Sequence, residues 1–515
     1  MKASDLPIHF NAVDILERNL PERAKKIALY SEERELSFQE ISNEVNQVGS
    51  ALKKLDVRAG EVVGILSLDV PEWVTCFFGA IKINAVSLGI NTLLKPQDYA
   101  FILRDARVRV LIVHEGLLKT IEGIRDEVPF LEHVIVIGEA TRPKDLRFEE
   151  WIGGESRELE VAPTHRDDFA TLNYTSGTTG EPKGILHAHK DLPLTAKLWG
   201  VNVCGLREDD RTFAAAKLFF TFGTGGNLIF PWFVGASTVL FAGSPRVATN
   251  VLEIIDRFQP TVFYTAPTGY AFMLAVEKFT ERYDLSSLRL CVSAGEALPA
   301  PIWRQWRERT GVDIVDGIGS TELYHIFLSN RPGDIRPGSS GQPFDGYELK
   351  LTDETGREVA DGEIGNLVVK GETSALSYLH DYERSRKTFL GEWVVTGDKY
   401  RRDEDGYYWH SGRTDDMLKV GGMWVSPVEV ESTLVGHPSV LECAVVGHED
   451  DAGLVKPKAF VVLKDKKTSE ELTNELIEYC KGQIAAYKRP RWIEYLEALP
   501  KTATGKIQRF RLRNE

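Results

Sequence analysis

The sequence lacks clustered cysteines and long apolar runs. Its five cysteines lie far apart and form no Cys-x-x-Cys pair, which argues against a disulfide framework and indicates free thiols in a reducing compartment. The polar start at residues 1–5 has no signal-peptide pattern. No uninterrupted apolar run reaches the ~18 residues that a membrane-spanning helix needs. We therefore expect a cytoplasmic protein with no membrane partner.

An excess of positive charge is also missing. The formal net charge is −14, from 62 basic and 76 acidic side chains, and the basic residues are dispersed along the chain. This balance argues against a nucleic-acid partner. With 515 residues, of which 43% are hydrophobic, the chain exceeds a single hydrophobic core and predicts two or more domains. We expect a monomer or a homodimer.

Strand and helix patterns alternate along the first part of the chain. Ser37 and Glu40 form a capping-box pattern that predicts a helix, and residues 62–66 and 71–81 predict a buried strand and a second helix. This alternation predicts an α/β fold. From residue 363 onward the sequence is rich in glycine, aspartate and tyrosine with short apolar runs, which predicts a β-rich subdomain.

The rest of the chain is organised around a segment rich in serine, threonine and glycine, which follows a predicted strand at residues 169–173. The segment reads Tyr174-Thr175-Ser176-Gly177-Thr178-Thr179-Gly180-Glu181-Pro182-Lys183-Gly184. It suits a loop around phosphate oxygens, because glycines let backbone N–H groups approach, hydroxyls donate and the ammonium adds charge. Pro182 before the lysine argues against the common P-loop of ATPases and kinases.

The order of these residues resembles the phosphate loop of the adenylate-forming superfamily, which includes acyl-CoA synthetases, luciferases and peptide-synthetase adenylation domains. The resemblance implies a large N-terminal domain of mixed sheets and helices with a β-rich subdomain, followed by a small mobile α+β domain. It also implies ATP as a substrate. By this resemblance, the loop residues that bind the nucleotide are Thr175, Ser176, Gly177, Thr178, Thr179, Gly180 and Lys183.

A second motif runs from Asp316 to Glu322 and is followed by His325. It resembles the superfamily's adenine and metal motif, which implies that Glu322 holds Mg²⁺, with Thr179 as a further metal-binding residue. Together with the segment that begins at His325, it resembles the benzoate-CoA ligase branch, in which the histidine borders the acyl site. Near this motif and at a neighbouring strand end, the residues assigned to nucleotide binding are Gly295, Glu296, Asp316, Gly317, Ile318, Gly319 and Thr321.

Further motifs lie toward the C-terminus. Residues 391–398 resemble the ribose motif, in which Asp398 accepts hydrogen bonds from two hydroxyls, and carboxylates suit such vicinal hydroxyls. Residues 412–419 resemble the hinge, which implies that Arg413 contacts ribose and that Asp415 is the pivot. The resemblance thus divides the chain into an N-terminal adenylation domain, 1–414, and a mobile C-terminal domain, 415–515.

The C-terminal domain carries two of the implied functional segments. Thr468 and Glu471 predict a capped helix within it. One segment resembles the loop that lines the pantetheine tunnel of coenzyme A, and the residues assigned there and at the hinge are Lys419, Gly421, Gly422 and Trp424. The other resembles the catalytic loop and contains Lys506, which we assign to adenylation. The residues assigned to catalysis are Lys506, Glu322 and His325.

The implied reaction joins a carboxylic acid to coenzyme A in two steps. ATP converts the acid into an acyl-adenylate with release of pyrophosphate, and coenzyme A then displaces AMP. A carboxylate is already ionised at neutral pH, so the first step needs charge neutralisation and alignment but no general base. Residues 217–226 combine aromatics with glycines, which fits either core packing or the wall of an acyl pocket.

The predicted acyl pocket is apolar or neutral, and its candidates are Phe220, Thr221, Phe222, Thr265, Ile318 and His325. The absence of a carboxylate in this set argues against an amino-acid substrate, and benzoate is the favoured acid. A 2-aminobenzoate, hydroxybenzoate or alicyclic carboxylate ligase stays open, because one methyl or hydroxyl changes discrimination by only ~1–3 kcal/mol.

Other classes of function also stay open. One alternative is a non-catalytic nucleotide-binding homologue, and another is an enzyme that loads a carrier protein. His187 and His189, two residues apart on a predicted strand, admit a metal pair. Without a neighbouring cluster of ligands, we interpret them as packing residues.

Overall fold

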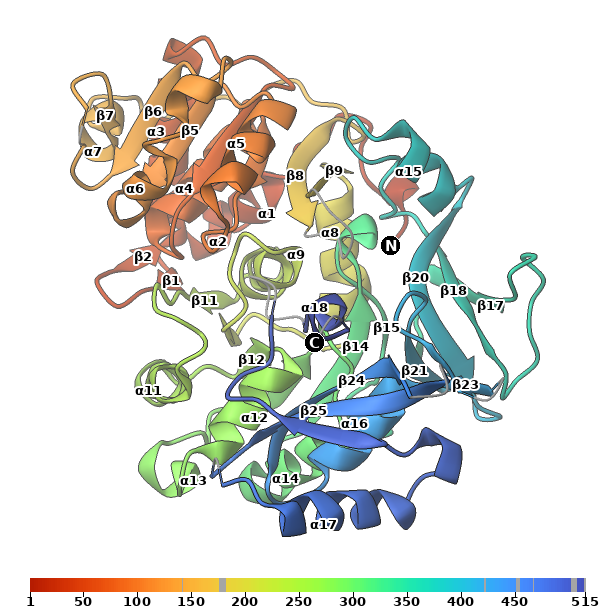
Figure 1. Ribbon diagram of the computed structural model, residues 1–515. Helices are drawn as coiled ribbons and strands as arrows, with labels where there is room; N and C mark the ends of the chain where they lie inside the picture. Colours follow the sequence, from red (N-terminus) through yellow and green to blue (C-terminus); the bar gives the residue numbers. More distant parts are fainter. Residues whose placement is uncertain are drawn as a thin grey trace.

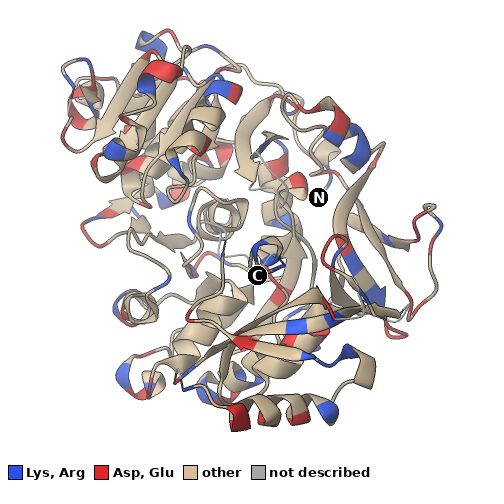
Figure 2. Cartoon of the chain, viewed as in Figure 1, with Lys and Arg blue, Asp and Glu red and all other residues tan. Residues whose placement is uncertain are grey.

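The computed structural model describes residues 1–140, 142–175, 182–420, 423–450, 454–465, 467–501 and 507–513. The chain forms two large sheets, a smaller sheet and a C-terminal α+β part (Figure 1). Within these described ranges, none of the helices has the length and apolar character needed to cross a bilayer. Basic and acidic residues are interspersed along the same elements (Figure 2).

The first large sheet has seven strands and is parallel except for its last pair. Its strands, in spatial order, are β7 (Leu146–Arg147), β6 (His133–Ile137), β5 (Val110–His114), β3 (Val62–Leu66), β4 (Val86–Gly89), β8 (Phe169–Thr175) and β9 (Lys183–Ala188). The inner strands are rich in valine and isoleucine, as expected where helices cover both faces. β8 and β9 are antiparallel with Thr175 opposite Lys183, so both ends of the predicted phosphate loop lie together.

Helices α3 (Phe38–Lys54) and α4 (Pro71–Lys82) pack against each other beside this sheet. The predicted capping box is confirmed, because Glu40 donates its N–H to Ser37 Oγ and accepts the Ser37 N–H at 2.8 Å. The predicted second helix is also confirmed and begins at Pro71, a residue that tolerates the first turn because it has no N–H to pair.

The second large sheet has nine strands and carries five consecutive parallel pairs, from β14 to β1 in its spatial order. Its order is β16 (Gln342–Pro343), β15 (Ile326–Ser329), β14 (Ile314–Gly319), β13 (Leu290–Ser293), β12 (Val262–Thr265), β10 (Arg211–Ala214), β11 (Ser237–Val239), β1 (Ile27–Tyr30) and β2 (Glu35–Ser37). Helices α11 (Ala248–Phe258), α12 (Pro267–Ala275) and α14 (Ala300–Thr310) connect its central strands. The carboxyl ends of β12, β13 and β14 therefore meet at one edge, where open α/β sheets bind ligands.

The predicted β-rich subdomain is a five-stranded antiparallel sheet. It contains β17 (Tyr347–Thr352), β18 (Ile364–Gly371), β19 (Phe389–Leu390), β20 (Trp393–Arg402) and β21 (Tyr408–Arg413), with α15 (Tyr382–Thr388) before β19. Its strands β20 and β21 place Asp398 directly opposite Arg413.

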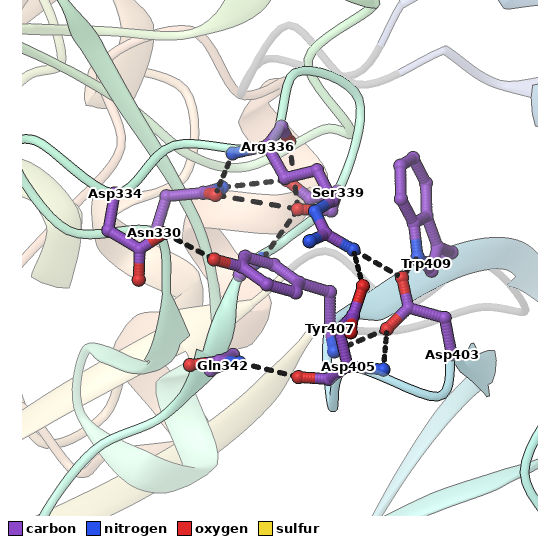
Figure 3. A network of polar contacts seen from close by, with 10 residues as sticks. Asn330, Asp334, Arg336, Ser339, Gln342, Asp403, Asp405, Tyr407 and Trp409 are labelled. Atoms are coloured by element: carbon purple, nitrogen blue, oxygen red, sulfur yellow. Dashed lines mark hydrogen bonds and ion pairs between the residues drawn. The ribbon is translucent and has the colours of Figure 1, made fainter.

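A polar network ties the loop after β15 to the hairpin between β20 and β21 (Figure 3). Arg336 Nη1 lies 2.9 Å from Asp405 Oδ2 and 3.2 Å from Asp403 Oδ2. The Arg336 guanidinium also lies 4.0 Å from the ring centroid of Tyr407. Trp409 Nε1 donates to Asp403 Oδ2 at 2.8 Å. The network fixes the nine-stranded sheet against the five-stranded sheet through side chains of both.

The C-terminal part is α+β. Its elements are β22 (Leu418–Val420), β23 (Met423–Val425), α16 (Pro427–Val435), β24 (Val440–Glu449), β25 (Val455–Leu463), α17 (Glu470–Lys481), β26 (Trp492–Tyr495) and α18 (Arg509–Leu512). The helix predicted to be capped by Thr468 is α17, but Ser469 is the cap, because its Oγ accepts the Leu472 N–H at 3.1 Å. β24 contacts α12, and α16 contacts α14, as Figure 1 shows for the blue and green elements.

Candidate active site

A cleft of about 1300 Å³ lies where the nine-stranded sheet, the five-stranded sheet and the C-terminal part meet. It gathers residues that the sequence analysis took from five separate motifs. The predicted site residues that line it are Thr175, Lys183, Gly295, Glu296, Gly317, Ile318, Gly319, Thr321, Glu322, Asp398, Arg413 and Trp424. The parallel strand ends explain this convergence, because β13 and β14 finish at the same edge of the sheet.

Some predicted residues do not line this cleft. Asp316 is buried in β14, and Lys419 is exposed, with its Nζ 5.7 Å from the ring centroid of Trp424. Others lie outside the described residues, and their roles stay predictions. They are Ser176, Gly177, Thr178, Thr179, Gly180, Gly421, Gly422 and Lys506.

Tyr378, which sequence reasoning missed, contacts both Glu322 and Lys183. Tyr378 donates its hydroxyl to Glu322 Oε1 at 2.8 Å, and Lys183 Nζ lies 4.9 Å from the Tyr378 ring centroid. Burial lowers the pKa of Lys183, while the Glu322 carboxylate acts in the opposite direction. Tyr378 comes from the chain after β18, far from both motifs in sequence, so no local pattern marked it. The arrangement places one cation and one carboxylate on the wall of the cleft.

Asp398 and Arg413 form a pair across β20 and β21. Arg413 Nη1 donates to both Asp398 oxygens at 3.2 Å and to the carbonyl oxygen of Thr396 at 3.1 Å. Gly397 has φ +76, and a Cβ there would lie 2.9 Å from Arg413 Nη2, so this turn favours glycine. The pair presents a carboxylate and a guanidinium to the cleft, a donor and acceptor set that suits hydroxyl and phosphate groups.

The C-terminal part presents a further wall. Ile507 to Phe510 line the cleft, and Ile507 pairs with Lys501 in an isolated antiparallel bridge. Lys501 contacts Glu442, and its Nζ lies 5.3 Å from the Phe272 ring centroid in α12. The residues on both sides of 502–506 therefore lie against the N-terminal part of the chain. Asp415, the predicted pivot, also lines the cleft, and its carbonyl oxygen accepts from Arg513 Nη2 at 2.7 Å.

Five rings pack against one another, and we call them the aromatic cluster. They are Trp199, Phe222, Phe230, Tyr264 and His325. Of these rings, the sequence analysis named only Phe222 and His325. Gly225 and Gly226 make the close packing possible, because a Cβ would lie 2.6 Å from His325 Cδ2 and 2.8 Å from Tyr264 Cδ1 respectively. Of the two alternatives that the sequence left open, core packing is observed for this segment, and its role as an acyl-pocket wall stays a prediction.

The other predicted acyl-pocket residues are distributed around this cluster. Thr221 and Thr265 are buried, and Ile318 lines the large cleft. Phe220 lines a second, much smaller cavity of about 30 Å³ together with Tyr174 and Pro182. The predicted pocket residues therefore extend from the cleft wall into the buried region beside it.

Asp316 is the buried carboxyl group of the second motif. It is 5% exposed, and its Oδ1 has no hydrogen-bond partner among the described residues. Burial raises the pKa of Asp316 from 3.8 to about 8. Because the pKa is raised in the folded state, this group stabilises the fold below about pH 4, and that contribution is lost as the pH rises through about 8.

We therefore expect the wild-type protein to lose stability relative to Asp316→Asn between about pH 4 and about pH 8. Asparagine carries no titrating proton, so the variant lacks this part of the pH dependence. The measurement is the free energy of unfolding in urea at several pH values. Parallel pH profiles for the two proteins would contradict the expectation.

The two histidines after the phosphate loop have separate partners. His187 Nδ1 lies 3.0 Å from Asp191 Oδ2, and its Nε2 lies 2.6 Å from the carbonyl oxygen of Thr321. His189 Nδ1 accepts the Ala12 N–H at 3.0 Å. Both rings are fully buried. Their ring nitrogens thus make hydrogen bonds inside the core. Through its contact with the Thr321 carbonyl oxygen, His187 fixes the backbone of the motif that contains Glu322.

Known proteins resemble this chain over almost its whole length. A crystal structure of the anthranilate CoA ligase AuaEII in complex with anthranoyl-AMP is 65% identical, covers 100% of this chain and 98% of its own, and has a TM-score of 0.98. The benzoate--CoA ligase of Thauera aromatica is 46% identical over 99% of this chain and 97% of its own length. A benzoate CoA ligase structure from Burkholderia xenovorans LB400 is 42% identical, covers 98% of this chain and 100% of its own, and has a TM-score of 0.91.

Family matches cover most of the sequence. Residues 16–379 match the AMP-binding enzyme family, and residues 429–506 match the AMP-binding enzyme C-terminal domain. The predicted division after residue 414 falls between the two matches and stays a prediction. The α/β fold and the adenylate-forming resemblance predicted from the motifs are confirmed. The chain therefore belongs to the AMP-binding enzyme family.

Proposed function

We propose that this protein is an AMP-forming ligase that joins a ring carboxylic acid to coenzyme A through an acyl-adenylate. The observation that carries the proposal is the cleft that gathers Lys183, Glu322, Asp398 and Arg413 beside the ends of β13 and β14. The likeness to an anthranilate CoA ligase at 65% identity over the whole chain supports it. ATP and coenzyme A are then the two co-substrates.

In the first step, two anions must meet at the α-phosphorus of ATP. Lys183 offers a cation on the cleft wall for phosphate oxygens, and Asp398 with Arg413 offers hydrogen bonds for the ribose hydroxyls. Lys506 would contribute the second cation, near the acid and the bridging oxygen. Its neighbours Ile507 and Gln508 line the same cleft, which supports this role. The contribution of these groups is charge neutralisation and alignment.

The residues present also fit a Mg²⁺ ion. Magnesium is usually bound by one or two carboxylates together with substrate phosphates, and Glu322 offers such a carboxylate on the cleft wall. Tyr378 donates a hydrogen bond of 2.8 Å to one oxygen of the Glu322 carboxylate, Oε1, and so orients that carboxylate. When bound, the ion would neutralise phosphate charge. Thr179 is the second proposed ligand.

In the second step, the thiol of coenzyme A displaces AMP from the mixed anhydride. We propose that the C-terminal domain turns about Asp415, withdraws Lys506 and positions Gly421, Gly422 and Trp424 for the thiol, with Trp424 already on the wall of the cleft. Trp424 is 48% exposed in this structure, so its ring is available for such a contact. A hinge formed by a few loop residues is the usual device for this kind of domain motion.

We place 2-aminobenzoate ahead of benzoate as the acid. The anthranilate CoA ligase is 65% identical to this chain, whereas the two benzoate-CoA ligases are 46% and 42% identical. The higher identity favours 2-aminobenzoate. An aromatic amine is uncharged at neutral pH, so it needs no carboxylate in the pocket, and the aromatic cluster supplies none. Benzoate is the second candidate and is favoured by the apolar packing of the same rings.

The test measures AMP release with ATP, Mg²⁺ and coenzyme A across 2-aminobenzoate, benzoate, the hydroxybenzoates, cyclohexanecarboxylate and octanoate. We expect 2-aminobenzoate to give the highest kcat/KM and octanoate the lowest, because closely packed rings exclude a flexible chain. Replacement of coenzyme A by a phosphopantetheinyl carrier protein separates ligase activity from carrier loading. Failure of every acid to release AMP would overturn the proposed function.

A further inference from the structure

The aromatic cluster contains three buried polar atoms that have no hydrogen-bond partner among the described residues. They are Trp199 Nε1, Tyr264 Oη and His325 Nδ1. All three side chains are 3% exposed or less. A buried polar group without a hydrogen-bond partner is destabilising, so a cluster of them calls for an explanation. Under the proposed function, a polar group of the bound acid is one such explanation, because it would supply a missing hydrogen-bond partner.

The hydrogen-bond pattern determines which nitrogen of His325 is the acceptor. Nε2 lies 3.3 Å from the carbonyl oxygen of Phe222. A carbonyl oxygen only accepts, so Nε2 carries the hydrogen. Burial lowers the pKa of His325 to about 3, so the ring is neutral at physiological pH. Nδ1 then has a lone pair and no donor.

Contacts on both its backbone and its ring hold His325 in one orientation. Gly319 lines the cleft, and a Cβ on it would lie 2.5 Å from the His325 carbonyl oxygen. Tyr324, the preceding residue, has φ +71, a strained conformation for a non-glycine residue. On the other side, Gly225 and Phe230 contact the ring. The direction of Nδ1 is therefore set by the fold and not by a flexible side chain.

We propose that His325 Nδ1 is the acceptor that selects an acid with an N–H donor on its ring. This inference rests on the proposed function and names the group that His325 recognises. In 2-aminobenzoate, one amine hydrogen bonds internally to the carboxylate, and the other is free to donate to Nδ1. Benzoate presents a C–H there and leaves the acceptor unpaired. In 2-hydroxybenzoate the single hydroxyl hydrogen is used internally, so an oxygen lone pair faces the nitrogen lone pair.

Two substitutions distinguish the effect of the Nδ1 acceptor from the effect of the shape of the ring. In His325→Gln, the side-chain amide reaches the place of Nε2 and donates to the Phe222 carbonyl, but no acceptor stands at the place of Nδ1. In His325→Asn, the amide oxygen occupies the place of Nδ1. The measured quantity is the ratio of kcat/KM for 2-aminobenzoate to kcat/KM for benzoate. We expect His325→Gln to lower this ratio by roughly 10-fold or more, as when a buried acceptor loses its donor, and His325→Asn to retain most of it.

A series of acids with the wild-type protein tests the same point without a substitution. 2-Fluorobenzoate has an ortho group of small size but no donor, and we expect it to be used less well than 2-aminobenzoate by roughly 10-fold or more. A purely structural role for His325 would lower kcat/KM for both acids equally in the variants. That result, or equal use of 2-fluorobenzoate and 2-aminobenzoate by the wild type, would overturn the inference. Absence of AMP release with every acid would instead overturn the proposed function.

Discussion

Lys506→Ala is expected to lower the rate of acid adenylation by roughly 100-fold or more, which is the size of effect seen when a preorganised charge contact is lost. The physical reason is that an anionic acid must approach an anionic phosphate, and neutralisation by a cation acts mainly at the crowded transition state. Formation of the thioester from supplied acyl-AMP should largely survive, because its leaving group is good and the domain motion removes this lysine from the site.

Two assays separate the half-reactions of this variant. Acid-dependent exchange of pyrophosphate into ATP reports adenylation, and AMP release from supplied acyl-AMP with coenzyme A reports thioester formation. Lys481→Ala is a matched control, because Lys481 is an exposed lysine of the same domain whose one ion pair among the described residues is with Glu478, at the end of α17. Equal losses in both assays for Lys506→Ala would contradict the assignment of this residue to one half-reaction.

Arg509→Met is expected to lower the stability of the C-terminal part by about 3–5 kcal/mol, the usual cost of breaking a largely buried ion pair by removing one partner. Arg509 Nε and Nη2 donate to the two Glu431 oxygens at 3.0 Å and 2.7 Å. Asp416 lies 3.7 Å from the same guanidinium. The Glu431 carboxylate raises the pKa of Arg509 against the opposing effect of burial. Without the guanidinium, the Glu431 carboxylate would lose its ion pair, whereas Asp416 would keep its contact with Arg513.

The measurement for Arg509→Met is denaturant unfolding of the full chain together with the adenylation rate. We expect both to decrease, because Arg509 also anchors the segment that follows Lys506. Arg511→Met is the matched control, since Arg511 is exposed and two residues away in α18. The double variant with Glu431→Gln should recover part of the lost stability, since it leaves fewer unpaired charges. An Arg509→Met protein as stable as the control would show that the pair contributes little.

Sequence patterns located much of the candidate site because its groups lie in short motifs at strand ends. Thr175 and Lys183 lie opposite each other on β8 and β9, and Glu322 follows β14 within a few residues. Such motifs depend on local backbone geometry, which neighbouring residues determine. Tyr378 carries no comparable signal, because its hydrogen bond to Glu322 joins residues 56 apart in sequence. Trp199, Phe230 and Tyr264 were missed for another reason: a buried aromatic residue of a pocket and one of a core look alike in sequence.

The sequence by itself determined the order of the motifs, the α/β class of the fold and the family, because these depend on residue type and spacing along the chain. Only the tertiary structure decided which motif residues face one cleft and which nitrogen of His325 is free to accept. Those properties arise from contacts between distant segments, such as Nε2 of His325 with the Phe222 carbonyl 103 residues away. The hydrogen bond that fixes this tautomer joins residues that are distant in sequence, so the spacing of residues along the chain does not predict it.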